Sequence, residues 1–164
     1  MNSYLEIQSL IHEMAWMIDT EREEEMIRTL MKDCVHQTPP NYTEMPAIEQ
    51  AEWAGKAHKR WGPDRKNLTK HLITNLNIDI DEEAGTARSR CYLTIVQGVR
   101  EVGFPLQPIF CGTYHDTFKR DQNGKWFYAT HRLDIDIEGE CCNHRNDFSD
   151  GSFESDEEHP DRRS

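Results

Sequence analysis

Two residues that lie far apart in the chain have side chains that could act together as an acid/base pair. Asp19 follows a segment with the apolar spacing of a helix, and a carboxylate at the C-terminal end of a helix is disfavoured by the helix dipole, so it needs a partner. His71 stands in a strand-like run, and an imidazole held by a carboxylate at one nitrogen can take a proton at the other. From the residues alone, a packing histidine and a solvated carboxylate remain alternative interpretations.

Other polar residues in the predicted strands could line the same site. His131 interrupts the apolar side of the last strand, and Tyr114 could donate a hydrogen bond to a substrate oxygen, although packing explains both residues equally well. His71, His115 and His131 lie on different strands, but no HxH, HxxE or HExxH spacing is present. The sequence also lacks a Gly-rich phosphate loop and a Rossmann fingerprint. We therefore expect no metal and no cofactor.

The elements that must position these residues follow from the hydrophobic periodicity. Three- and four-residue spacing predicts a helix over residues 4–18, a second that Thr20 caps, and a third from Pro46 to Trp61. Residues rich in β-branched and aromatic side chains predict four long strands, over 68–80, 86–99, 108–120 and 125–137. The Asn123-Gly124 pair is a strong hairpin signal. This pattern predicts an α+β fold in which N-terminal helices pack on a curved, mainly antiparallel sheet.

Strict alternation along the last strand divides its side chains between two faces. Phe127, Ala129 and His131 would share one face, and Trp126, Tyr128 and Thr130 the other. An outer face that bears large aromatic residues usually needs cover. We therefore expect a homodimer or homotrimer.

Composition limits the partners and the compartment. The chain has 164 residues and a formal net charge of −11, from 30 acidic and 19 basic side chains. Such a charge repels nucleic acids and anionic membrane surfaces. The N-terminal segment does not read as a signal peptide, so we expect a cytoplasmic protein. We expect one domain over residues 1–139, followed by a disordered acidic tail over 140–164.

Several short motifs together resemble SnoaL-like proteins of the nuclear-transport-factor-2-like superfamily. The likeness spans about residues 3–137. The motifs that carry it are Ile18-Asp19, Met31-Lys32-Asp33-Cys34-Val35, Lys70-His71-Leu72-Ile73-Thr74-Asn75, Gly112-Thr113-Tyr114-His115-Asp116, Gly124-Lys125-Trp126 and His131-Arg132. Similar proteins include a dehydrochlorinase, scytalone dehydratase, bile-acid dehydratases and polyketide cyclases. The resemblance implies a cone-shaped α+β barrel with a pocket.

The resemblance also implies roles for individual residues. His71 matches the base of the family's His–Asp dyad, and Asp19 matches its orienting partner. The substrate-binding residues expected beside this dyad are His131, Tyr114, Trp16, Trp53 and Arg132. Met14 stands where the dehydrochlorinase has a lysine, and His131 stands where the family usually has an arginine. Dehalogenation by the same contacts is therefore not expected.

The sequence thus leads to two functional hypotheses. The first is a cofactor-independent lyase or isomerase, similar to a dehydratase, that acts on a small hydrophobic and cyclic molecule. The second is a non-catalytic ligand-binding or subunit-assembly module of the same fold. A contact between Asp19 and His71 that faces an open cavity would favour the enzyme.

Overall fold

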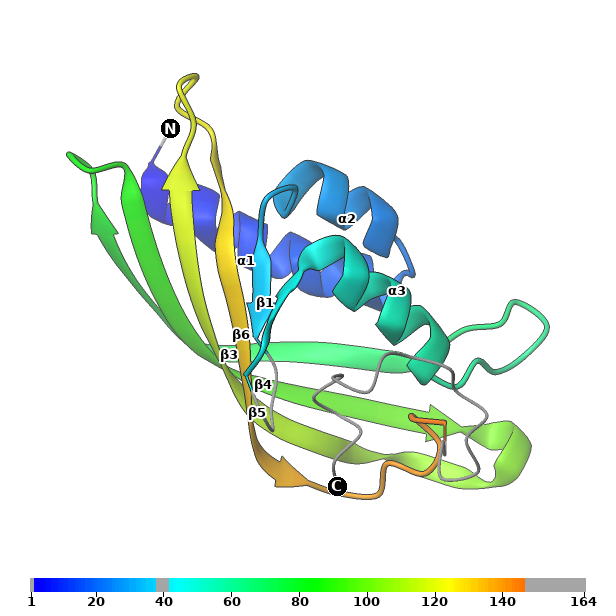
Figure 1. Ribbon diagram of the computed structural model, residues 1–164. Helices are drawn as coiled ribbons and strands as arrows, with labels where there is room; N and C mark the ends of the chain where they lie inside the picture. Colours follow the sequence, from blue (N-terminus) through cyan, green and yellow to red (C-terminus); the bar gives the residue numbers. More distant parts are fainter. Residues whose placement is uncertain (1, 38–41, 147–164) are drawn as a thin grey trace.

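The computed structural model describes residues 2–37 and 42–146, and it contains three α-helices on one side of a curved sheet (Figure 1). Helix α1 spans Ser3–Asp19, α2 spans Glu23–Leu30 and α3 spans Ala47–Ala57. The N-cap of α1 is Asn2, whose side chain accepts a hydrogen bond from the Tyr4 N–H at 2.9 Å. Within the described residues, no helix is long and apolar enough to cross a membrane.

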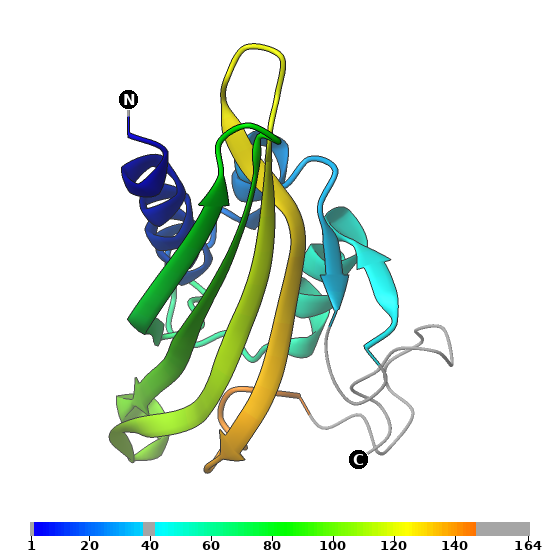
Figure 2. The ribbon, with the colours of Figure 1, turned by 90° about the vertical axis from the view of Figure 1, so that its left-hand side faces the viewer.

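Six strands form one sheet in the order β2-β1-β6-β5-β4-β3. The four long strands are β3 (Thr69–Asp81), β4 (Thr86–Val99), β5 (Phe104–Arg120) and β6 (Trp126–Glu138). They pair antiparallel, whereas the short strand β1 (Val35–Gln37) pairs parallel to β6 and antiparallel to β2 (Glu44–Pro46). A 3₁₀ turn at Arg100–Val102 joins β4 to β5. The view onto the sheet shows the long strands side by side, with β1 and β2 extending one edge (Figure 2).

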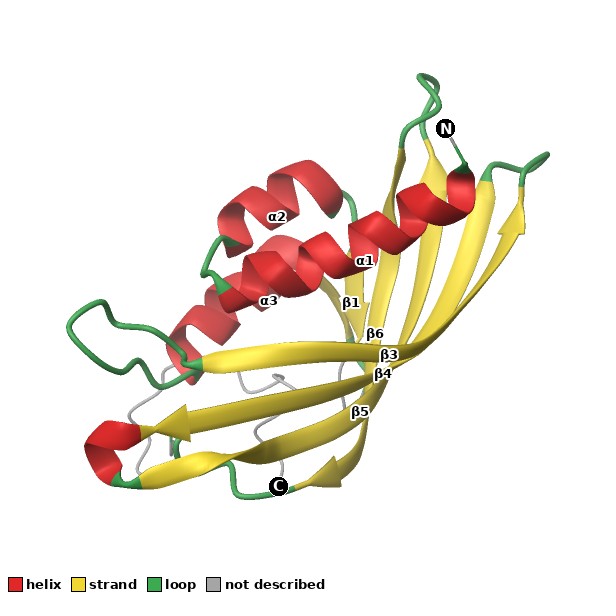
Figure 3. Cartoon of the chain, turned by 180° about the vertical axis from the view of Figure 1, so that it is seen from behind, coloured by secondary structure: helices red, strands yellow, loops and turns green. Residues whose placement is uncertain are grey.

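The core lies between the helices and the inner face of this sheet (Figure 3). The inner stripe of α1 consists of Ile7, Ile11 and Met14, each at most 1% exposed. These residues recur every three or four positions, so they occupy one face of the helix. The predicted fold class is therefore confirmed: helices pack on a curved, mostly antiparallel sheet that does not close into a barrel.

The pairing register shifts at several points of the sheet, and two of these β-bulges change the predicted faces of β3 and of the first half of β6. In β3 the pairing register shifts between Thr74 and Asn77, and Asn75 there has a φ of +54°. An extra residue moves all later side chains to the opposite face. His71, Ile73, Leu76, Ile78 and Ile80 consequently all face inward and are partly buried, although plain alternation divided them between two faces.

Because of a second bulge, the observed faces of β6 differ from the predicted ones. The register with β5 shifts between Thr117 and Phe118, so that Tyr128 pairs with Phe118 and Thr130 pairs with Thr117. Trp126 and Tyr128 are 2% and 0% exposed and belong to the core, so their predicted place on the outer face is wrong.

The homodimer or homotrimer remains a prediction. The exposed apolar side chains that support it are not those that the sequence pattern placed on the outer face. The large apolar residues exposed on the outer face are Leu72, Tyr92 and Ile137, at 47%, 53% and 67%. They lie on neighbouring rows of the sheet. Light scattering of the full chain in solution tests this prediction.

The segment that follows β6 packs against the domain instead of leaving it at residue 140. The backbone N–H of Lys59 donates to the carbonyl of His144 at 2.9 Å, and the N–H of Asn146 donates to the carbonyl of Ala57 at 2.8 Å. The indole N–H of Trp61 donates to the carbonyl of Asn143 at 2.9 Å. Residues 141–146 are therefore part of the folded unit, and the rest of the expected tail lies outside the described residues.

Candidate active site

The predicted pair meets at the place where the end of helix α1 crosses the edge strand β3. Asp19 is the last residue of α1, and His71 is the third residue of β3. The ring Nδ1 of His71 lies 2.7 Å from Asp19 Oδ1. The backbone N–H of His71 donates to the second carboxylate oxygen, Oδ2, at 2.9 Å.

The edge position of β3 explains why this contact forms. Because β3 has a neighbouring strand on one side only, the N–H of His71 has no strand partner on the other. The Asp19 carboxylate satisfies this N–H and the imidazole together, which holds the ring in one orientation. The two side chains are 8% and 7% exposed. This geometry favours the tautomer with hydrogen on Nδ1, which leaves Nε2 unprotonated and able to accept a proton.

A cavity of about 150 Å³ lies beside this pair, between the helices and the sheet. Its wall includes apolar side chains of the sheet, such as Leu93, Ile95 and Phe110, and residues of all three helices. Five histidines also line it: His36, His58, His71, His131 and His144. The site is therefore a mixed apolar and imidazole-rich pocket, and the cone is not filled by its own side chains.

A second histidine–aspartate pair involves His131, which lines the same cavity. His131 of β6 faces Asp116 of β5 across the strand pair, and its Nδ1 lies 2.7 Å from Asp116 Oδ1. The side chains are 7% and 0% exposed, and the hydroxyl of Ser89 approaches the other carboxylate oxygen at 3.5 Å. A buried carboxylate requires such partners. Asp116 therefore orients His131 as Asp19 orients His71.

Tyr114 and His36 flank this second pair. The ring centroids of Tyr114 and His36 lie 4.4 and 4.9 Å from that of His131. Burial raises the pKa of Tyr114, and the nearby Asp116 charge raises it further, so its hydroxyl stays protonated and can donate a hydrogen bond. Burial holds the pKa of His36 well below its usual value, so this ring is neutral at neutral pH.

The predicted substrate-binding residues separate into two groups. His131, Tyr114 and Trp53 line the cavity, as expected. Trp16 is 60% exposed on α1 and does not line it, so its prediction as a pocket residue is wrong. Arg132 is also misplaced, because its guanidinium pairs with Asp134 at 2.8 and 3.0 Å outside the cavity.

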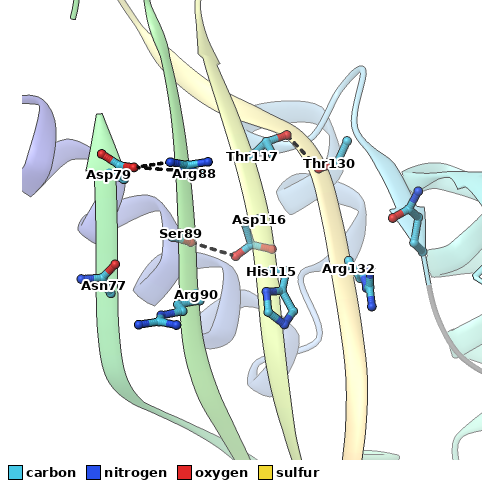
Figure 4. A pocket seen from close by; sticks show the side chains of 11 residues that line it. Asn77, Asp79, Arg88, Ser89, Arg90, His115, Asp116, Thr117, Thr130 and Arg132 are labelled. Carbon is cyan, nitrogen blue, oxygen red and sulfur yellow. Dashed lines mark hydrogen bonds and ion pairs between the residues drawn. The ribbon is translucent and has the colours of Figure 1, made fainter. Parts of the chain in front are cut away.

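Arg132 lies instead at an open hollow of about 500 Å³ on the outer face of the sheet (Figure 4). Most side chains around this hollow are polar and point away from the helices. Arg88 pairs there with Asp79, at 2.7 Å, and both side chains are largely exposed. Exposed ion pairs of this kind contribute little and activate no group for chemistry. The outer hollow is therefore not the candidate active site.

Metal ligation is not supported by the geometry of the imidazoles. Among residues 2–37 and 42–146, no group of three or more histidine, cysteine, aspartate or glutamate side chains is placed to hold a metal ion. His58 and His144 instead stack on each other, with centroids 4.4 Å apart. The histidine–aspartate pairs are suited to proton transfer.

Sequence reasoning missed three of the histidines that line this cavity and the aspartate that binds a fourth. His36 lies on a strand of three residues, too short to give a periodic signal. Asp116 was visible as a strand residue but was not assigned to His131. His58 and His144 come from the two segments that an isolated bridge joins, and that pairing has no sequence signature.

Comparisons with known proteins agree with this architecture. The family model of the SnoaL-like domain matches residues 1–132. A comparison with curated proteins gives no match. Solved structures with the same fold include a single-residue variant of Rv3472, a Mycobacterium tuberculosis protein of unknown function, at 19% identity and a TM-score of 0.64. That match covers 82% of this chain and 72% of the other.

Two further solved structures are similar. A Novosphingobium aromaticivorans protein provisionally named a scytalone dehydratase has 19% identity and a TM-score of 0.62, with 82% of this chain and 85% of that chain covered. ActVI-ORFA from Streptomyces coelicolor has 12% identity and a TM-score of 0.63, with 81% and 96% covered. Identities this low establish the fold alone. Because the family model spans most of the sequence, the chain belongs to the SnoaL-like domain family.

Proposed function

We propose that the protein is a cofactor-independent lyase or isomerase of the dehydratase type, in which His71 removes a proton from carbon. The observation that carries this proposal is the contact of His71 with Asp19 on the wall of an open cavity. A histidine that serves only for packing would be surrounded by other side chains and would not line an unfilled cavity. A contact between Asp19 and His71 that faces an open cavity was the observation expected of the enzyme, so this geometry supports the enzyme over the non-catalytic module.

The roles of the residues follow from their partners. Asp19 fixes the tautomer of His71 and stabilises the imidazolium that forms when Nε2 takes a proton. In an elimination, this imidazolium returns the proton to the hydroxyl oxygen as the C–O bond breaks, so that the group leaves as water and His71 is neutral again. A C–H proton is acidic only when the carbanion can delocalise onto an oxygen. The protonated hydroxyl of Tyr114, which packs against His131, is the group that would donate a hydrogen bond to that oxygen and stabilise its negative charge.

The size of the cavity limits the substrate to a small ring. A protein cavity of about 150 Å³ holds one benzene molecule. The space here is of the same volume, so it accommodates a single six-membered ring. We propose small cyclic ketones and their hydroxylated derivatives as the substrate class.

Deuterium exchange and elimination together test the proposed role of His71. With 3-hydroxycyclohexanone in D₂O, NMR follows exchange of the protons beside the carbonyl, and absorbance follows loss of water to cyclohexenone. We expect the wild type to accelerate both reactions, and we expect the rates with His71→Ala to be lower by about 10²-fold or more. His115→Ala is the matched control, because His115 lies on the outer face of the sheet. Equal rates for His71→Ala and the wild type would exclude the proposal.

A further inference from the structure

Besides His36, which packs against His131, three residues of the cavity wall carry a buried polar side-chain atom that has no hydrogen-bond partner within the described residues. These atoms are the side-chain oxygens of Asn67 and Gln50 and the Nδ1 of His144. Asn67 and His144 are 4% and 6% exposed. All three side chains line the cavity that holds the His71–Asp19 pair. Because buried polar groups are almost always hydrogen-bonded, such a group of atoms points to a ligand that supplies the missing partners.

The backbone around two of these atoms is held firmly. The side-chain amide of Gln97 donates to the carbonyl of Asn67 at 2.8 Å and to the carbonyl of Asn143 at 3.2 Å. It therefore ties the loop before β3 to the segment that carries His144. His144 in turn stacks on His58 with an angle of 28° between the rings. The unpartnered atoms thus belong to a preorganised wall and not to a mobile surface.

The segment that supplies His144 lies beyond the part of the chain that the family model matches. The SnoaL-like family model ends at residue 132, whereas residues 141–146 lie beyond it and are bound to α3 and the residues that follow it. His144 and Arg145 of this segment both line the cavity. This part of the wall is therefore a candidate for what distinguishes the ligand of this protein.

The atoms present select a neutral group that donates hydrogen bonds. Two amide oxygens, of Asn67 and Gln50, repel a carboxylate or phosphate. Arg145 lines the same cavity and disfavours an ammonium group. Burial lowers the pKa of His144 to about 4, so its ring is neutral near pH 7 and offers no charge to an anion. A hydroxyl group fits, because it can donate to an amide oxygen and also bond to an imidazole nitrogen.

We infer that Asn67, Gln50 and His144 form a hydroxyl-binding subsite. The ligand is then a single-ring compound with a hydroxyl group in addition to the carbonyl group that Tyr114 would bind. The inference adds a hydroxyl group to the small hydrophobic ligand expected from the sequence. It rests on the proposed function for the assignment of this cavity to the substrate, but ligand binding tests it without turnover.

Two ring ketones of nearly equal size provide the test. The dissociation constants of 4-hydroxycyclohexanone and 4-methylcyclohexanone for the full chain are measured by NMR titration at pH 7. We expect the hydroxyl compound to bind at least about tenfold more tightly. Equal binding, tighter binding of the methyl compound, or no binding of either would overturn the inference.

Variants locate the preference within the cavity. Asn67→Leu and His144→Phe keep the size of each side chain but remove the polar atoms, so each should reduce the preference severalfold. Either variant alone suffices if the other fails to fold. Asn143→Leu is the control, because Asn143 neighbours His144 but its side chain does not line the cavity. A preference that survives in both cavity variants would contradict the subsite.

The outcomes separate this inference from the proposed function. If the hydroxyl preference holds but His71→Ala leaves the exchange rate unchanged, the subsite stands and the proposed chemistry fails. If His71→Ala abolishes exchange but the two ketones bind equally, the chemistry stands and the subsite fails.

Discussion

The burial of His144 predicts a specific loss of stability in weak acid. The folded protein holds the pKa of His144 at about 4, against 6.5 for an ordinary histidine, because burial disfavours the imidazolium. Between these values the unfolded chain binds more protons than the folded one. The stabilisation is therefore complete above about pH 6.5 and is lost progressively as the pH falls towards 4.

The size of the effect follows from the two pKa values. Lowering the pH from 7 to 5 should reduce the free energy of unfolding by about 2 kcal/mol through His144 alone. The side chain is only 6% exposed, so solvent screening reduces this figure little. Other groups also titrate in this range, and the effect of His144 is isolated by comparing the wild type with His144→Phe, which cannot take up a proton.

Urea unfolding followed by circular dichroism at pH 7, 6 and 5 provides the assay. We expect the free energy of unfolding of His144→Phe to fall by about 2 kcal/mol less than that of the wild type over this range. His12→Gln is the control, since His12 is exposed on α1, and it should follow the wild type. If His144→Phe and the wild type lose stability in parallel, His144 is not buried as described, and the packing of residues 141–146 on the cavity is refuted.

Three further predictions concern the core, the sheet and the dyad. Tyr128 is fully buried with no hydrogen-bond partner for its hydroxyl among the described residues, so Tyr128→Phe should raise stability by about 1 kcal/mol in thermal unfolding; a loss of stability would show that the hydroxyl is satisfied. A Cβ at Gly112 would collide with the backbone oxygen of Asp134, so Gly112→Ala should lower the free energy of unfolding by about 2–3 kcal/mol. Gly55→Ala is the control, because a Cβ there meets no neighbour and should cost no stability. Similar effects of the two substitutions would contradict the strand register. Asp19→Asn keeps the size of the side chain but loses the charge, so catalysed exchange of ring ketones should fall about 10²–10⁴-fold; an unchanged rate would exclude the orienting role.

Much of the fold could be predicted because its signals are local. The apolar stripe of α1 repeats at helical spacing, and the four long strands are rich in β-branched and aromatic residues. The turn before β6 carries its own signature, since Asp121 Oδ1 accepts the N–H groups of Asn123 and Lys125 at 2.8 and 2.9 Å. Signals of this kind locate elements without any knowledge of tertiary contacts.

The faces of the strands were harder to predict, because one extra residue reverses them. Regular pairing outward from the turn before β6 would place Asp116 opposite Thr130. The bulge at Ala129 shifts the register by one residue and brings His131 opposite Asp116 instead. The same shift buries Trp126 and Tyr128. Since no residue type in this stretch marks a bulge, the second histidine–aspartate pair could not be derived from alternation.

The His71–Asp19 pair was predicted from the family resemblance, and spacing alone would not have given it. The two residues meet because the end of α1 reaches the free edge of β3. This contact depends on the tertiary structure and leaves no local signal in the sequence. His36, His58 and His144 were missed for the same reason. Each reaches the cavity from a short strand or a loop, where the sequence carries no periodic signal.

Nitrogen-15 NMR of the histidine rings in the full chain tests the arrangement of His71 most directly. If Asp19 binds Nδ1 and the cavity leaves Nε2 free, the His71 signals at pH 7 should be those of the tautomer protonated on Nδ1, and Asp19→Asn should shift them. Addition of a ring ketone should perturb the Nε2 signal before that of His115 on the outer face. A His71 ring protonated on Nε2 and unaffected by Asp19→Asn would contradict the account.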